Sequence, residues 1–272
     1  MNKFIVSPSP HAFSGESIPR LMYGVIISLL PALGVSVFYF GLGMLIVTTV
    51  SILSCILFEY LVQKFMMKVK PSHMDGSAIL TGLLLAFCLP ANIPFWMVMI
   101  GALAAVGIGK MTFGGLGNNI FNPALVGRVF LFISFPVAMT AWPEPGQWMQ
   151  YTDAVTGATP LGLMKEGLAF KTVGEIMPEV PSTLHLFLGK MSGSAGEISA
   201  LALLVGMLYM LYRTIISWQI PLSILGTVFV FTGILWLVNP DRFADPLFHL
   251  LTGGLMLGAI YMATDYVTSP MS

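Results

Sequence analysis

Long apolar runs separated by short polar stretches make up most of the chain. The first two runs cover residues 21–40 and 42–63, and they meet at the Gly41-Leu42-Gly43 sequence. Further runs cover residues 93–109, 122–141, 197–212, 215–238 and 245–264. A helix needs about 20 apolar residues to cross a hydrocarbon core of about 30 Å. The pattern therefore predicts an all-α polytopic membrane protein, with a very tight turn at Gly41.

One apolar stretch is too short to cross the membrane alone. Residues 76–89 would rise only about 21 Å as a helix, which is less than the hydrocarbon core. Asp75 is placed to cap the start of this helix, and Pro90 stops it. The pattern predicts a broken half-helix that ends at membrane depth, as in transporter folds with sites near the midplane.

A recurring Leu-Thr-Gly sequence predicts an internal repeat. Leu80-Thr81-Gly82 recurs as Leu251-Thr252-Gly253, and each copy follows an Asp and two apolar runs. With the N-terminus inside, the two copies run in opposite directions, which is typical of inverted-topology repeats. We expect the two segments to pack against each other near the midplane through their glycines. The second copy has no counterpart of the fourth and fifth helices, so the second repeat is predicted to be incomplete.

Basic residues predict how the helix bundle is oriented. Those on one predicted side are Lys3, Arg20, Lys64, Lys68, Lys70, Lys110 and Arg213. Cytoplasmic loops are enriched in Lys and Arg, so this side and the N-terminus are predicted to be cytoplasmic. The chain then divides into a cytoplasmic tail (1–20), a first membrane repeat (21–141), an extracytoplasmic segment (142–196) and a second, incomplete repeat (197–272). The long polar segment 142–196 is expected to form a small loop subdomain.

The composition supports a membrane protein and excludes several other classes. Charged residues make up 9% of the chain, against about 25% in soluble domains, and hydrophobic residues make up 56%. The net charge of zero gives no reason to expect a nucleic-acid partner. Cys55 and Cys88 lie in apolar runs and form no CxxC pair, and the four His show no ligand spacing. No protein metal site is therefore expected.

Two polar features interrupt the first repeat. Residues 112–123 are rich in Gly and Asn, and they either lie at the cytoplasmic surface or re-enter the membrane buried in protein. Arg128 lies in the helix predicted for residues 122–141. An Arg inside a span is costly unless it is paired or reaches the interface. Arg128 therefore either extends to the cytoplasmic surface or contacts a cofactor.

The segment 142–196 contains the polar motif Asp153-Ala-Val-Thr156-Gly157-Ala158-Thr159. Pro160 fixes its own φ and favours an extended Thr159, and Gly157 permits a sharp turn just before it. The Thr159 hydroxyl is therefore predicted to lie on an ordered turn, able to carry a group. Local chemistry alone favours a simpler interpretation, an Asx- or Thr-type turn that closes a loop.

The motif resembles the flavinylation motif D-x-x-[ST]-G-A-[ST], found in the D subunits of Rnf complexes and the B subunits of the sodium-translocating NADH:quinone reductases. Four other stretches are similar to the Rnf D subunits: Ser7-Pro-Ser-Pro-His11, Asp75-Gly-Ser-Ala-Ile-Leu-Thr-Gly82, Gly117-Asn-Asn-Ile-Phe-Asn-Pro-Ala124 and Ala263-Thr-Asp-Tyr-Val-Thr-Ser-Pro270. The resemblance implies that a dedicated FMN transferase joins the FMN phosphate to Thr159. It also implies that Asp153 orders the loop and serves recognition by the transferase, and that Thr156 shapes the turn.

The resemblance further implies a subunit of a complex in the cell membrane that is not catalytic alone. In the family, electrons pass between reduced ferredoxin and NAD while Na⁺ or H⁺ crosses the membrane, and partner subunits carry the iron–sulfur and other flavin groups. A second, non-covalent flavin, riboflavin, is implied within the membrane part. Asn118, Asn122 and Arg128 are candidate contacts for it, since amide and guanidinium groups can hydrogen-bond a flavin's polar edge. The structural alternative is that the two Asn cap a helix and a turn.

Two other functions remain open from the sequence. An inverted repeat with half-helices would also be expected in a urea-channel-like fold, so a solute channel or carrier without a redox role is an alternative. A purely structural scaffold within a larger assembly is another. The motif at residues 153–159 separates them, because a channel has no reason to carry it.

Overall fold

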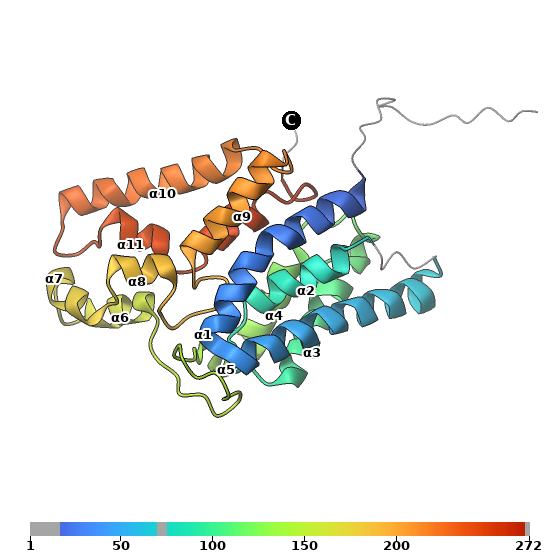
Figure 1. The fold of residues 1–272 in the computed structure, drawn as a ribbon, viewed down its shortest axis with the longest axis horizontal. Coiled ribbons are helices and arrows are strands. Elements are labelled where there is room, and N and C mark those ends of the chain that lie inside the picture. Colours follow the sequence, from blue (N-terminus) through green and yellow to red (C-terminus); the bar gives the residue numbers. More distant parts are fainter. Residues whose placement is uncertain (1–16, 70–74, 270–272) are drawn as a thin grey trace, which may run out of the picture.

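A computed structural model describes residues 17–69 and 75–269, and Figure 1 shows their arrangement. The Ser7-Pro-Ser-Pro-His11 stretch, most of the predicted N-terminal tail, and Lys70 lie outside the described residues. The described part is helical, and its only strand-like feature is an isolated bridge between Pro143 and Thr156. Three segments are long and apolar enough to cross a membrane: Ile18–Met67, Phe95–Phe113 and Gln219–Val238. The prediction of an all-α, multi-pass membrane protein is confirmed.

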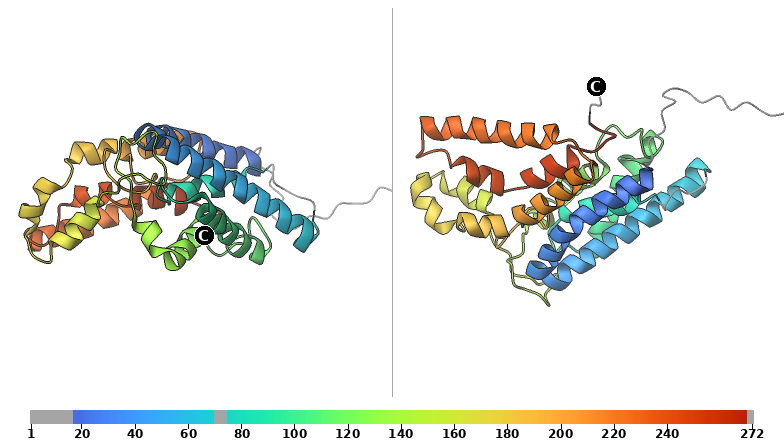
Figure 2. Two further views of the ribbon diagram at one scale, coloured as in Figure 1. Left: turned by 90° about the horizontal axis from the view of Figure 1, so that it is seen from below. Right: turned by 45° about the horizontal axis from the view of Figure 1, so that its top comes forward.

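The element α1 (Ile18–Leu61) consists of two helices that meet at Gly41. The backbone there is non-helical, with φ 57° and ψ −130°, and the two parts fold back along each other in both views (Figures 1 and 2). Glycine is required at this position, since an ideal Cβ would lie 2.2 Å from the Trp148 carbonyl oxygen. The predicted tight turn is confirmed. The π-helical segment η1 (Val62–Met67) continues this second helix.

The predicted half-helix is α2 (Ser77–Phe87), which packs along α1 and is buried on almost every residue. The N-cap is Gly76 rather than Asp75, so the predicted cap is wrong by one position. Asp75 still satisfies the helix start, because its Oδ1 accepts hydrogen bonds from Ser77 N at 2.9 Å and Ser77 Oγ at 2.6 Å. The chain returns through α3 (Phe95–Leu103), η2 (Ala104–Ile108) and η3 (Met111–Phe113).

The helix predicted for residues 122–141 is two helices, α4 (Pro123–Ser134) and α5 (Pro136–Thr140). The prediction of one continuous helix is wrong. Phe135, with φ −136° and ψ 59°, separates them. Pro136 causes the break, because a proline disfavours the helical conformation in the residue before it and offers no N–H to continue the ladder.

The polar interval holds α6 (Pro160–Gly167), α7 (Val173–Ile176), η4 (Met177–Glu179) and α8 (Thr183–Leu188). These short helices share a small core with the first residues of α11 (Pro246–Leu251). In this core Phe248 packs with Met164, Ile176 and Leu186, all nearly inaccessible to solvent. Figure 1 shows α6, α7 and α8 grouped beside α11 at one end of the molecule. The loop subdomain is therefore built partly from the second repeat.

The part of the chain predicted to be the second repeat contains α9 (Ala200–Tyr212), α10 (Gln219–Val238), α11, α12 (Leu255–Leu257) and η5 (Gly258–Met262). A single half-helix over residues 245–264 is wrong, because the helix breaks between Thr252 and Gly254, with Gly253 at φ 71°. The two repeats meet in one large core around α1, α2 and α9. Tyr261 OH donates to Ser28 O at 3.1 Å across this core.

The Leu-Thr-Gly segments have similar local bonding but do not pack together as predicted. Thr81 Oγ1 donates to Ser77 O at 2.9 Å, and Thr252 Oγ1 donates to Phe248 O at 2.6 Å, the same pattern in each copy. An ideal Cβ on Gly82 would lie 2.7 Å from Ile52 Cα. On Gly253 it would meet Leu161 Cδ1 at 2.9 Å. Each glycine is thus already covered by another element.

The two half-helices instead approach each other at residues that follow the Leu-Thr-Gly segments. Gly196 N donates to Phe87 O at 2.9 Å at the C-terminal end of α2. An ideal Cβ on Gly196 would lie 2.5 Å from Leu257 Cδ2 of α12. Gly196 therefore lies between the end of the first half-helix and the helical turn after the break in the second.

Candidate functional site

Thr159 is the N-cap of α6. Its Oγ1 accepts a hydrogen bond from Gly162 N at 3.0 Å, and its backbone is extended with φ −70° and ψ 155°. Pro160 occupies the first helical position, where its missing N–H costs nothing, and its ring is buried. The Thr159 side chain is half-buried. The hydroxyl is thus fixed on an ordered turn, as predicted from the residues around it.

The motif backbone runs against residues 142–144. Gly157 N donates to Trp142 O at 2.9 Å, and Glu144 N donates to Val155 O at 3.0 Å. Gln147 clamps the same strip, because its Oε1 accepts from Val155 N at 2.6 Å and its Nε2 donates to Val155 O at 2.7 Å. Sequence reasoning missed Gln147, since a single Gln between Gly and Trp belongs to no motif.

The remaining motif residues have different positions from Thr159. Asp153, Thr156 and Ala158 are exposed, and Asp153 has no hydrogen-bond or ion-pair partner among the residues that the structure describes. The loop is ordered by Gln147, which bonds Val155, rather than by Asp153 as predicted. Thr156 helps to hold the loop through its backbone, which forms an isolated antiparallel β-bridge with Pro143.

Gly157 is needed for close packing, and its φ does not lie in the left-handed region. An ideal Cβ there would lie 2.9 Å from Glu144 Oε1 and 2.9 Å from Ser192 Oγ. Any larger residue would push these side chains away from the acceptor loop. The sequence predicted that Gly157 permits a sharp turn. The structure instead shows that Gly157 is needed because a side chain would collide with Glu144 and Ser192.

This arrangement fits a phosphate ester on Thr159. The first N–H groups of a helix lack intrahelical partners, and the helix dipole favours negative charge at this end. A phosphate on Thr159 Oγ1 would lie at the N-terminus of α6, where the helix dipole favours an anion. Because the ester oxygen keeps lone pairs, it can still accept the bond from Gly162 N.

The three residues predicted to contact a second flavin lie in separate places. Asn122 caps α4, with Oδ1 accepting from Ala124 N at 3.0 Å, which is the structural alternative. Asn118 is exposed. Arg128 pairs with Glu197, with 3.9 Å between Nη2 and Oε1, and its side chain is 32% exposed. Arg128 thus links the two predicted repeats next to Gly254. An ideal Cβ on Gly254 would lie 3.6 Å from Arg128 Nη1.

Asn122 lines a small cavity between the two repeats, and Arg128 does not. Ser77, Lys110 and Asn119 line it from the first repeat, and Tyr261 and Asp265 line it from the second. Its volume is about 70 Å³, whereas pockets for ligands of flavin size measure about 300–1,000 Å³. The cavity fits a few waters, and Asn119 Oδ1, buried without a hydrogen-bond partner, offers them an acceptor.

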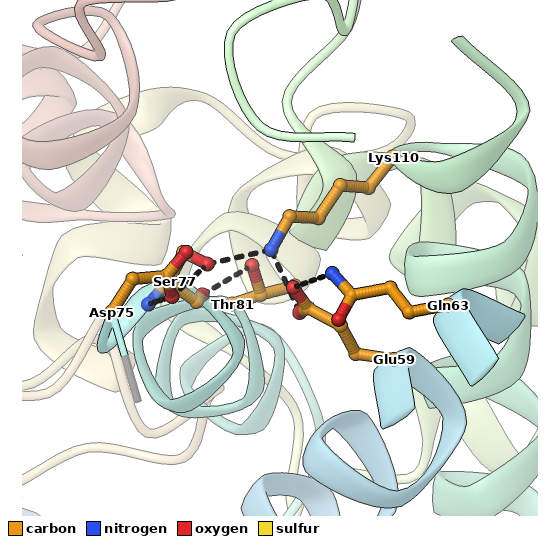
Figure 3. Close-up of polar contacts among 6 residues, drawn as sticks. All are labelled: Glu59, Gln63, Asp75, Ser77, Thr81 and Lys110. Atoms are coloured by element: carbon orange, nitrogen blue, oxygen red, sulfur yellow. Dashed lines mark hydrogen bonds and ion pairs between the residues drawn. The ribbon is translucent and has the colours of Figure 1, made fainter. Parts of the chain in front are cut away.

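A buried ion pair lies next to this cavity (Figure 3). Lys110 Nζ lies 2.7 Å from Glu59 Oε2 and donates to Ser77 Oγ at 2.7 Å, and both charged side chains are 1% exposed. Gln63 Nε2 donates to Glu59 Oε1 at 3.2 Å. Lys110 was predicted on the cytoplasmic side of the membrane, and the structure adds that its side chain is held inside the bundle by Glu59. No sequence signal joins two residues so far apart along the chain.

Comparisons with known proteins show to which family the chain belongs. A family profile described as the NQR2, RnfD, RnfE family matches residues 5–272. A Clostridium ljungdahlii protein is 43% identical over 272 residues, covering 100% of this chain and 81% of its own length. Its name is that of the D subunit of a proton-translocating ferredoxin:NAD(+) oxidoreductase complex.

Two further relatives carry related names. The D subunit of the Na(+)-translocating ferredoxin:NAD(+) oxidoreductase complex of Acetobacterium woodii is 44% identical over 269 residues, covering 98% of this chain and 78% of its own length. The D subunit of the ion-translocating oxidoreductase complex of Rhodobacter capsulatus is 38% identical over 281 residues, 97% of this chain and 78% of its own length. With the profile and relatives covering nearly every residue, the chain belongs to the NQR2, RnfD, RnfE family.

Proposed function

We propose that this chain is the flavin-carrying membrane subunit of an ion-translocating ferredoxin:NAD oxidoreductase complex. FMN is joined through its phosphate to Thr159 by a dedicated FMN transferase. The cofactor supplies electron transfer, and the protein supplies its position and electrostatic surroundings. The sites for ferredoxin and NAD lie on partner subunits that carry iron–sulfur and other flavin groups, and the coupling ion is Na⁺ or H⁺.

One observation carries the proposal. Thr159 Oγ1 is half-buried at the N-terminus of α6, held at 3.0 Å by Gly162 N, within a D-x-x-T-G-A-T sequence. The loop before it is held by Gln147 and by backbone bonds, so the acceptor oxygen keeps its place while the exposed Asp153 and Thr156 remain open to a transferase. A tether at this point keeps the cofactor with the protein and leaves its ring free.

The proposed topology places the N-terminus in the cytoplasm and the 142–196 segment outside it. Lys64, Lys68 and Arg213 support this, because all three are exposed and basic residues favour the cytoplasmic side. The apolar helices are surrounded by membrane lipid. The inverted repeat of the urea-channel type remains part of the proposal, supported by the matching Thr81 and Thr252 hydrogen bonds.

A non-covalent riboflavin in the membrane part stays a prediction, with Asn118, Asn122 and Arg128 as its candidate contacts. In the structure Asn122 caps α4 and lines a cavity of about 70 Å³, and Arg128 pairs with Glu197.

The acceptor assignment is tested by replacing the hydroxyl. The protein is produced together with its FMN transferase, denatured, and separated on a gel that is viewed under ultraviolet light. Thr159→Ala is expected to remove the fluorescent band, whereas Thr159→Ser, which keeps a hydroxyl, retains it. Thr156→Ala is the matched control, since its side chain is exposed and its role is carried by the backbone.

Two results would contradict the proposal. Fluorescence that survives in denatured Thr159→Ala would place the flavin elsewhere. A wild-type band without fluorescence would favour a solute channel, a carrier or a structural scaffold, none of which needs a bound flavin.

A further inference from the structure

A groove opens beside the acceptor Thr159. It has a volume of about 530 Å³, within the range of ligand sites. Ala158 and Pro160, the two neighbours of Thr159, line it on one side together with Leu163 of α6. Pro181 and His185 lie among the residues that line it from the η4–α8 part of the chain. A group attached to Thr159 Oγ1 therefore starts at the edge of this groove.

The lining of the groove combines apolar surface with unequal charge. Pro160, Leu163, Pro181 and Met191 provide apolar contacts, which suit a flat ring. Glu144 and Glu179 are also in the lining, and Lys171 pairs with Glu179 at 2.6 Å. Lys190 is exposed in the groove and forms no ion pair within the part of the chain that the structure describes. Its positive charge is therefore available to a ligand.

The backbone that carries Lys190 is held in place. Gly189 ends α8 with φ 100°, and an ideal Cβ at this position would lie 2.2 Å from Ile198 O, so the turn requires glycine. Lys190 N donates to His185 O at 2.9 Å. The next residue, Met191, is buried in the small core. The Lys190 side chain thus projects from a fixed point.

We propose that this groove holds the isoalloxazine ring of the FMN on Thr159, with Lys190 beside the ring as a positioning charge. The inference rests on the proposed function and names the residues that surround the ring. Uptake of two electrons and one proton turns the neutral oxidised ring into a reduced ring with one negative charge. Lys190 stabilises that charge, because opposite charges attract strongly near a protein surface. It therefore raises the midpoint potential of the tethered flavin.

The test measures the midpoint potential of the covalent flavin by absorbance during a redox titration of the purified full chain. Lys190→Gln is expected to shift the potential to a more negative value, and Lys190→Glu is expected to shift it further. Lys190→Arg keeps the charge and is expected to stay near the wild type. Lys165→Gln is the matched control, since Lys165 is an exposed lysine of α6 that does not line the groove.

A second measurement reports where the ring lies without depending on charge. Iodide is expected to quench the fluorescence of the tethered flavin less than that of free FMN, because the groove covers the ring. Equal quenching would assign the groove to another occupant and overturn the inference. So would a potential that is the same in Lys190→Gln, Lys190→Glu and Lys165→Gln. In both cases a denatured wild-type band that fluoresces, with fluorescence lost in Thr159→Ala, would still uphold Thr159 as the acceptor, so the two proposals fail separately.

Discussion

Replacing Lys110 by Met removes one partner of the ion pair inside the bundle. At an effective dielectric constant of about 20, unit charges 2.7 Å apart attract by about 6 kcal/mol, most of which offsets the cost of taking both charges out of water. Lys110→Met leaves the Glu59 carboxylate buried without the Lys110 ammonium that lies 2.7 Å from it. Breaking a buried pair in this way costs about 3–5 kcal/mol. We expect Lys110→Met and Glu59→Gln each to lose stability on that scale.

The double variant Glu59→Gln/Lys110→Met separates the effect of losing the ion pair from the effect of leaving one charge buried alone. It buries no charge, and a Gln at position 59 can still bond Gln63, so it is expected to lose less stability than either single variant. Coupling between contacting residues is typically about 0.5–3 kcal/mol. Lys64→Met is the control for removing a lysine, because Lys64 is exposed and its contacts are local: it donates to Tyr60 Oη at 2.8 Å and lies over the Phe65 ring.

The two cysteines provide the assay. Cys55 and Cys88 are both 0% exposed, so a thiol-reactive fluorophore labels the detergent-solubilised protein only as it unfolds. The unfolding temperature is expected to fall clearly in both single variants, less in the double variant and hardly at all in Lys64→Met. A Lys110→Met protein that unfolds at the wild-type temperature would refute the reasoning. A double variant whose loss equals the sum of the single losses would also refute it.

Three other outcomes depend on individual contacts. Gly157→Ala is expected to lower the yield of covalent flavin on denaturing gels, because the ideal Cβ lies 2.9 Å from Glu144 Oε1, and Glu144→Ala in the same chain should recover part of that yield. A cysteine at the exposed position Ser182 is expected to react with a membrane-impermeant maleimide added to intact cells, and labelling only after lysis would reverse the proposed topology. Gly82→Leu is expected to destabilise the bundle by at least about 1–3 kcal/mol in the thiol assay, because the ideal Cβ lies 2.7 Å from Ile52 Cα. The flavin fluorescence at Thr159 is expected to persist, and an unchanged unfolding temperature would contradict that packing.

Features set by local chemistry could be predicted from the sequence. The turn at Gly41 follows from two apolar runs with almost nothing between them, and the short α2 follows from its length and Pro90. The ordered Thr159 follows from Pro160, which starts α6. The FMN assignment needed the family resemblance, because the same local chemistry also describes a simple loop turn.

Features set by contacts between distant residues could not be predicted. Glu59 and Lys110 come from different elements, and each alone suggests an ordinary charge near a membrane surface. Gln147 can bond Val155 of the motif because residues 142–144 lie beside it. The two Leu-Thr-Gly segments suggested mutual packing, but the arrangement of the whole bundle places Ile52 against Gly82 and Leu161 against Gly253. The break at Phe135 is the exception, since Pro136 is a local signal for it.

The core that Phe248 shares with Met164, Ile176 and Leu186 has a consequence for biosynthesis. The ribosome makes α6 long before it makes α11, and until then the apolar faces of α6–α8 have no cover. The small core beneath α6–α8 is thus complete only after the second repeat has been inserted. We expect the transferase to modify a finished protein rather than a nascent chain. A fragment that ends before α11 is expected to be a poor substrate, even though it contains the whole motif.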